Sequence, residues 1–95
     1  PPRSTLFPYT TLFRSAGLLA QYGLWRQAVQ ANMAFIAAYP SHRYAPDCHL
    51  TVGEILVSRL ENEKEAVPHL IIAAKTHESP AMRNKARGLL ALIRT

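Results

Sequence analysis

Apolar residues recur at helical spacing through most of this chain, and short polar breaks separate the stretches. The clearest stretch is Gly23–Pro40, whose apolar positions repeat about every 3.6 residues, a period that only a helix places on one face. These positions are Trp25, Ala28, Val29, Phe35, Ile36 and Tyr39. Along the whole chain the pattern predicts five helical segments and no strand, near 16–22, 24–39, 45–60, 63–76 and 80–94. The predicted fold class is all-α, built from antiparallel helical hairpins.

Glycine and proline mark the ends of these segments. Gly23 breaks the chain before the second segment, and Pro40 stops that segment. Pro46 suits the first turn of the third segment, where its missing N–H costs nothing. Ser79 followed by Pro80 is a typical pair of N-cap and first-turn residues. The boundaries therefore agree with the apolar periodicity.

The fourth segment carries two conflicting signals. Asn62 and Glu65 have the spacing of a capping box, which predicts a helix that begins at about residue 63. Pro68 then lies beyond the first turn and removes one intrahelical hydrogen bond. We therefore expect this helix either to kink near residues 64–68 or to begin later than the capping spacing indicates.

Two of the segments open in the same way, which indicates an internal repeat. Trp25-x-x-Ala28 and Glu63-x-x-Ala66 begin equivalent helices, and the interval from position 28 to position 66 is 38 residues. Gly53 lies in the middle of the segment between them, where glycine costs about 1 kcal/mol relative to alanine. A close approach by a neighbouring helix would explain a glycine at that position.

The spacing Gly-x-Trp-x-x-Ala, with Pro40 twelve residues after Ala28, resembles the second half of a tetratricopeptide repeat. The resemblance implies a short solenoid of stacked helical pairs. Its implied repeat-packing positions are Trp25, Ala28, Pro40, Gly53 and Ala66. The chain departs from the pattern at Asn32 and Phe35, where the family favours an aromatic residue and an alanine, and its interval exceeds the family period of about 34. A related helical-pair repeat therefore stays open.

The start of the chain needs separate treatment. Thr5–Ser15, TLFPYTTLFRS, matches the in-frame translation of a common short-read sequencing adapter at eleven consecutive positions. We expect residues 1–15 to be a non-native segment of this origin, with a proline-rich linker as the alternative. The helical-repeat domain is then 16–95, with a truncated first repeat and the 80–94 helix as its terminal or capping helix. Few contacts are expected from residues 1–15, whose 11–15 end adjacency alone could draw into the first helix. The truncation should leave Leu18 and Leu19 partly uncovered.

Composition and charge change this picture little. The chain has a net charge of +5, and without Arg3 and Arg14 the remaining nine basic and six acidic residues give +3. This excess is too small to imply a nucleic-acid partner. No apolar run approaches the length of about 18 residues that a membrane-spanning helix needs. Cys48 is the single cysteine, which excludes an internal disulfide framework.

Candidate chemistry is sparse. The side chains that could bind a soft metal are His42, Cys48, His49 and His69. Zinc sites use paired ligands at spacings such as Cys-x-x-Cys, and neither this spacing nor His-x-x-x-His occurs. Cys48 falls on the predicted apolar face, where a free thiol is inert packing. We therefore expect no catalytic, cofactor-binding or metal-binding residues and no enzyme activity.

The last segment carries a stripe of basic residues at Arg83, Arg87 and Arg94. The stripe is a candidate basic surface for an acidic peptide or a nucleic acid. No aromatic residue interleaves it, so base stacking is unsupported. A solvated outer helix face is the favoured interpretation.

The tetratricopeptide resemblance implies a protein–protein interaction or scaffold module, part of a larger protein, whose partner is a peptide or helix. Tyr39–Leu56 is similar to repeats of bacterial envelope-assembly proteins, and both the cytoplasm and the bacterial cell envelope fit. The neighbouring repeats of a parent chain are further expected partners. One alternative is a regulatory C-terminal tail of a membrane enzyme such as a rhomboid-like protease. Nucleic-acid binding is the third hypothesis and predicts an affinity that falls steeply with salt.

Overall fold

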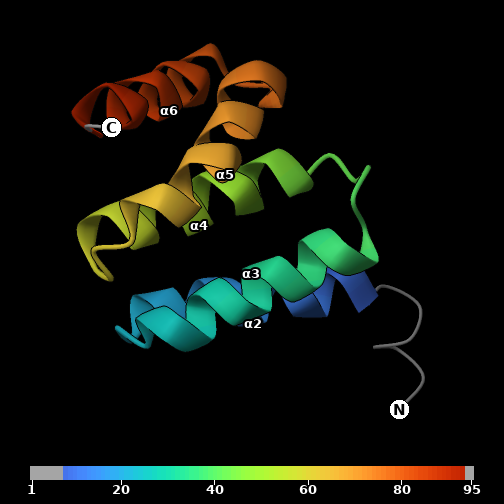
Figure 1. The fold of residues 1–95 in the computed structure, drawn as a ribbon. Helices are drawn as coiled ribbons and strands as arrows, with labels where there is room; N and C mark the ends of the chain where they lie inside the picture. The colour runs from blue at the N-terminus through green and yellow to red at the C-terminus, as the bar shows by residue number, and fades with distance from the viewer. Residues whose placement is uncertain (1–7, 94–95) are drawn as a thin grey trace.

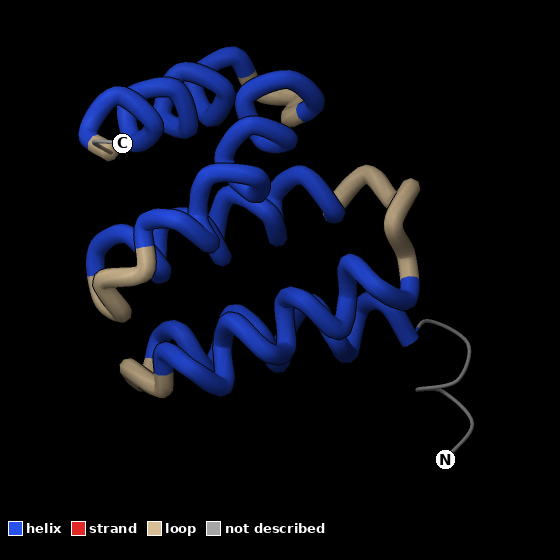
Figure 2. Tube along the Cα trace, in the orientation of Figure 1, coloured by secondary structure: helices blue, strands red, loops and turns tan. Residues whose placement is uncertain are grey.

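The computed structural model describes residues 8–93, which form five helices and no strand. The helices are α2 (Pro8–Gln21), α3 (Trp25–Ala38), α4 (Ala45–Ser58), α5 (Glu63–Thr76) and α6 (Pro80–Leu92). Each runs antiparallel to the next, so α2 pairs with α3 and α4 pairs with α5, while α6 packs on α5 (Figure 1). Short connections join them (Figure 2). The all-α, hairpin-based fold class is therefore confirmed.

The first helix differs from the prediction. It begins at Pro8, eight residues before the predicted start near residue 16. A proline fits the first helical position because its missing N–H has no intrahelical partner there. Leu12, Ala16 and Leu19 continue the helical period backwards, and the side chain of Ala16 is 1% exposed. The other four helices match the predicted segments within two residues at each end.

An aliphatic core lies between α4, α5 and α6. Its buried members are Leu50, Val52, Leu56, Ala66, Leu70, Ala73, Ala74 and Ala86. Gly53 of α4 faces Leu70 of α5 so closely that an added Cβ would lie 2.5 Å from Leu70 Cδ2. Since Leu70 is itself 0% exposed, the expected close approach at Gly53 is present. Small residues on α5 and α6 let the helices approach in the same way.

A separate aromatic cluster joins the α2–α3 hairpin to the start of α4. Its rings belong to Phe13, Phe35, Tyr39, His42 and Tyr44. Phe13 stacks on Tyr44 with ring centroids 4.6 Å apart and also contacts Phe35 at 5.9 Å. The expectation of few contacts from residues 1–15 is therefore wrong at Phe13. The physical reason is that α2 continues through this segment and turns the Phe13 ring towards the connection between α3 and α4.

The helix ends show which sequence signals act. The Ser79 hydroxyl accepts a hydrogen bond from the Met82 N–H at 3.4 Å, as its N-cap position predicts. Asn62 occupies the predicted N-cap of α5, but its side chain donates to the Glu65 carboxylate at 2.6 Å and accepts no backbone N–H. The α5 helix nevertheless begins at Glu63 and continues through Pro68, so the later start is wrong. The ribbon of α5 bends along its length (Figure 1).

Several large apolar side chains of the α2–α3 hairpin are exposed. Leu18 is 50% exposed, Tyr22 is 76% exposed and Leu24 is 42% exposed. These residues surround the tight turn at Gly23, whose φ of 76° is a left-handed conformation that glycine adopts without strain. Leu19 is only partly buried. An apolar strip of the predicted kind thus lies at this end of the hairpin.

Candidate functional site

The five predicted repeat-packing residues occupy different environments. Ala28 and Ala66 are both 0% exposed, and Gly53 is buried against α5. Trp25 is half-buried at the start of α3. Pro40 is exposed and lies in the connection that follows α3. The three small residues therefore pack in the interior, while Trp25 and Pro40 each line a surface pocket.

The first of these, the Trp25 pocket, lies where α2 and α3 meet α4 and has a volume of about 240 Å³. Its lining residues are Ala20, Trp25, Thr51, Glu54, Ile55, Ser58 and Arg59. Ile55 is 4% exposed and supplies an apolar floor. The Arg59 guanidinium lies over the Trp25 ring, with Cζ 4.7 Å from the ring centroid, in cation–π geometry. The pocket thus combines apolar surface, an aromatic wall and polar groups.

At the edge of the Trp25 pocket, Glu54 forms an ion pair with Lys85 of α6, with Nζ and Oε2 3.0 Å apart. The Ser58 hydroxyl donates to the Glu54 backbone carbonyl at 2.6 Å. Within residues 8–93, no hydrogen bond or ion pair is present at the Arg59 guanidinium. Its N–H groups are therefore available to a carbonyl or carboxylate of a bound molecule.

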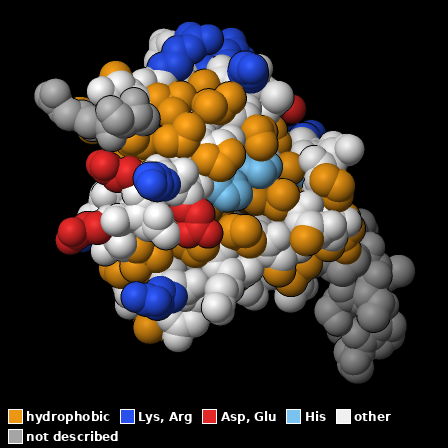
Figure 3. Space-filling view, viewed as in Figure 1, with side chains coloured by type: hydrophobic (Ala, Val, Ile, Leu, Met, Phe, Trp, Pro, Cys, Tyr) orange, Lys and Arg blue, Asp and Glu red, His pale blue; other side chains and the backbone are white. Residues whose placement is uncertain are grey.

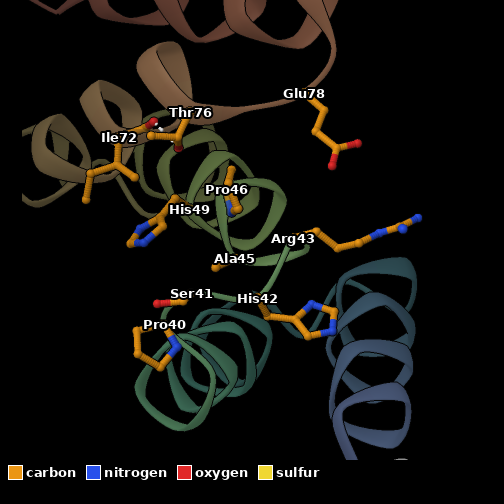
Figure 4. A pocket seen from close by; sticks show the side chains of 10 residues that line it. All are labelled: Pro40, Ser41, His42, Arg43, Ala45, Pro46, His49, Ile72, Thr76 and Glu78. Atoms are coloured by element: carbon orange, nitrogen blue, oxygen red, sulfur yellow. Dashed lines mark hydrogen bonds between the residues drawn. The ribbon is translucent and has the colours of Figure 1, made fainter.

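The second pocket, the His49 pocket, has a volume of about 350 Å³ and lies between the α3–α4 connection and the end of α5. Figure 4 shows His49 and Ile72 on one side and Pro40 and Ser41 on the other, whereas Arg43 points away into solvent. On the face drawn in Figure 3, histidine side chains lie among hydrophobic ones. The His49 pocket is therefore bounded by apolar and imidazole surface together with the polar side chains of Ser41, Thr76 and Glu78.

Two histidines that are 20 residues apart in the chain meet beside this pocket. The Nδ1 atoms of His49 on α4 and His69 on α5 are 2.8 Å apart, a hydrogen bond between two rings. Burial and, to a smaller extent, the neighbouring His69 together lower the pKa of His49 to about 4. Burial also lowers the pKa of His69, against the opposing effect of the Glu65 carboxylate. Both imidazoles are therefore neutral at pH 7.

A further histidine joins α4 to the end of α5. His77 accepts a hydrogen bond at Nδ1 from the Ser79 N–H at 3.0 Å, so its neutral ring carries the proton on Nε2. That Nε2 lies 3.2 Å from Asp47 Oδ1 and donates to it. The sequence spacing did not predict either histidine contact. The sequence feature that could have indicated these contacts is the antiparallel pairing of the two helices about the Arg59–Lys64 turn, which places the start of α4 beside the end of α5.

The predicted basic stripe is partly engaged within the chain. Arg83 Nη1 donates to the backbone carbonyls of His77 at 2.6 Å and Glu78 at 3.2 Å, and so satisfies acceptors at the end of α5. Arg87 Nη1 donates to Asn84 Oδ1 at 3.3 Å. Arg94 lies outside the described residues. The structure therefore places Arg83 in a structural contact and leaves Arg87 on the outer face of α6.

The remaining candidates for chemistry do not converge. Cys48 is buried, and burial together with the Asp47 charge raises the pKa of its thiol to about 12. Such a thiol stays protonated at pH 7 and is a poor nucleophile. Within residues 8–93, no group of three or more His, Cys, Asp or Glu side chains could hold a metal ion. The Trp25 pocket, the His49 pocket and the histidine pair are thus candidate sites among the described residues. A third pocket, of about 240 Å³, is lined by Arg26, Val29, Gln30, Leu56, Leu60, Asn62 and Glu65.

The comparisons with known proteins add no relative. No family model matches the chain, and no curated protein and no solved structure is significantly similar to it. Among residues 8–93, no helix has the length and apolar character needed to cross a membrane. The structure therefore defines the chain by its class, an all-α protein of consecutively packed helical hairpins.

Proposed function

We propose that this chain is a protein–protein interaction module of the tetratricopeptide-like kind, which binds a peptide or helix of a partner protein. The observation that carries the proposal is the Trp25 pocket. It presents a buried apolar floor at Ile55, an indole wall and a guanidinium that has no hydrogen-bond or ion-pair partner among the described residues. Aromatic residues and arginine beside an apolar pocket are the groups that dominate the energetics of protein interfaces.

The packing around the pocket supports this proposal. Ala28 and Ala66 are fully buried at equivalent positions of α3 and α5, as the repeat pattern requires. The Glu54–Lys85 ion pair connects α4 to α6 beside the pocket. The pocket is therefore lined by side chains on helices that the hairpin packing holds in place, which limits the entropy lost on binding.

The engagement of the basic stripe favours a protein partner over a nucleic acid. Arg83 is committed to the end of α5, and Lys85 is paired with Glu54. Fewer free positive charges then remain on α6 to neutralise phosphates. The uncommitted Arg59 guanidinium instead lies on an aromatic ring in a small pocket, which suits a single peptide group better than a phosphate backbone.

Peptide display tests this proposal. A random library of short peptides is selected on the immobilised chain, and binding of each enriched peptide is followed by the fluorescence of Trp25, the only tryptophan. We expect the enriched peptides to change this emission on binding. Arg59→Ala should weaken them by at least about tenfold, a loss of about 1.4 kcal/mol.

The matched control is Arg87→Ala, which removes an arginine from the outer face of α6 and should leave the affinity unchanged. Anisotropy of a labelled peptide provides a second measurement for Trp25→Ala, which has no tryptophan signal. If the library yields no binder, or if the binders tolerate both Trp25→Ala and Arg59→Ala, the Trp25 pocket is not the binding site.

A further inference from the structure

The contact between His49 and His69 has a specific protonation requirement. The Nδ1 atoms are 2.8 Å apart, the ring centroids are 5.0 Å apart and the ring planes differ by 33°. A hydrogen bond between two ring nitrogens holds one proton, so one ring donates Nδ1–H and the other accepts through a bare Nδ1. The accepting ring then carries its own proton on Nε2. Two protonated rings would place two N–H groups against each other.

The position of the pair gives this requirement a structural consequence. His49 is 8% exposed, and His69 is half-buried on the facing helix. His69 is followed directly by Leu70, whose side chain fills the space above Gly53. The hydrogen bond therefore joins α4 and α5 next to their closest approach. Repulsion between two charged rings would act on the same interface.

We propose that the His49–His69 pair is an acid-sensitive latch between α4 and α5, closed while both rings are neutral and released when both become protonated. The latch needs no ligand and adds a function beyond the binding module proposed above. Its release separates His49, which lines the His49 pocket, from His69 on the facing helix α5.

Charged and titratable groups on the surrounding elements modulate the latch. The Glu65 carboxylate, one turn before His69 on α5, favours the protonated form of that ring. Arg43 also lines the His49 pocket, but its side chain points away from His49 (Figure 4). The α6 helix supplies no charged lining residue to the His49 pocket or to the neighbouring pocket that contains Glu65. The other groups are His42 and Glu78 at the His49 pocket, Arg26 on α3 and Asp47 on α4.

The direction of the pH effect follows from linkage. Burial, together with the neighbouring His69, lowers the pKa of His49 to about 4 in the folded chain, whereas an unperturbed histidine titrates near 6.5. Between these values the unfolded chain binds more protons than the folded chain, so folding stability rises with pH. The contribution of the pair is therefore complete above about pH 6.5 and is lost as the pH falls towards 4.

Nitrogen-15 NMR of the imidazole rings of the unaltered chain tests the latch directly. At pH 7.5 we expect one of the two rings as the Nδ1–H tautomer and the other as the Nε2–H tautomer. Both rings should titrate below pH 6.5 and in a coupled manner. Two Nε2–H tautomers at pH 7.5, with independent titrations near pH 6.5, would overturn the proposal.

Denaturant unfolding at pH 7.5 and pH 5 provides the second measurement. In the unaltered chain the unfolding equilibrium constant should rise by about ten- to thirty-fold on acidification, given the lowered pKa of His49. The double variant His49→Gln/His69→Gln, which cannot titrate, should lose most of this rise. His42→Asn is the control, since the asparagine Oδ1, attached to Cγ like the imidazole Nδ1, can replace that acceptor of the Tyr44 N–H. An equal pH effect in the double variant would exclude the latch even if the NMR tautomers were as expected.

Discussion

The two contact regions of the molecule are built on opposite principles. The aliphatic core between α4, α5 and α6 contains small residues that bring helix backbones together, with Leu70 filling the space over Gly53. The aromatic cluster instead joins the α2–α3 hairpin to α4 through ring faces and edges around Phe35, which is 0% exposed. The aliphatic core has a close contact between Gly53 and Leu70, whereas the aromatic cluster has half-buried rings around a single buried one.

The difference has an energetic meaning. In a tightly interdigitated core, either the removal or the addition of a methyl group lowers the free energy of unfolding. Ring contacts at the molecular surface are individually worth about 0.5–1.5 kcal/mol beyond the area they bury. We therefore expect substitutions in the aliphatic core to destabilise the whole fold and substitutions at the edge of the aromatic cluster to have smaller effects.

Leu70→Ala should produce the largest effect. The side chain is fully buried, and removing it leaves a cavity above Gly53, so the expected loss is about 2–5 kcal/mol of unfolding free energy. The matched control is Ile71→Ala at the next position, where the side chain is 39% exposed and the loss should be about 1 kcal/mol or less. Urea unfolding followed by circular dichroism measures both. Equal losses at the two positions would show that Leu70 is not a core residue.

Two glycines in helices give the second prediction. An added Cβ at Gly53 would collide with Leu70, whereas nothing lies within 4 Å of a Cβ added at Gly88 of α6. Gly53→Ala should therefore lose about 1–2 kcal/mol after the gain in helix propensity is included. Gly88→Ala should gain about 0.5–1 kcal/mol. Thermal unfolding should give a lower melting temperature for Gly53→Ala and a higher one for Gly88→Ala than for the unaltered chain. A stabilising Gly53→Ala would contradict the tight approach of α4 and α5.

The helices of this fold could be predicted from the sequence because their ends carry local signals. Gly23, Pro40 and the Ser79–Pro80 pair act within a few residues, so their effect can be read without knowing the tertiary structure. The predicted first helix begins near residue 16 because residues 1–15 are excluded on their inferred adapter origin, apart from residues 11–15, which adjacency could draw in, whereas α2 begins at Pro8. The origin of a sequence does not decide its conformation. Leu12 and Ala16 fit the apolar period of a helix, and both lie in α2.

The candidate sites could not be predicted in the same way. Apolar periodicity assigns a residue to a helix face, but it does not say how far one helix is shifted along another. The His49–His69 bond and the Trp25–Arg59 contact both depend on that shift. The contact of Arg83 could not be predicted either, because its long side chain extends from α6 back to the backbone carbonyl of His77 at the end of α5. These contacts are properties of the packed helices.

Phe13→Ala should produce the smallest effect of the three and tests the aromatic cluster at its edge. Phe13 is half-buried and stacks on Tyr44, so we expect a loss of about 1 kcal/mol, or a melting temperature about 4–8 °C lower for a domain of this size. The control is Leu18→Ala in the same helix, where a 50% exposed side chain should contribute less. Both variants keep α2 intact because alanine is the best helix former. A melting temperature unchanged by Phe13→Ala would mean that residues 8–15 are helical only as an extension of the residues that follow. A clear decrease would mean that this segment stabilises the fold through its own side chains, whatever the origin of its sequence.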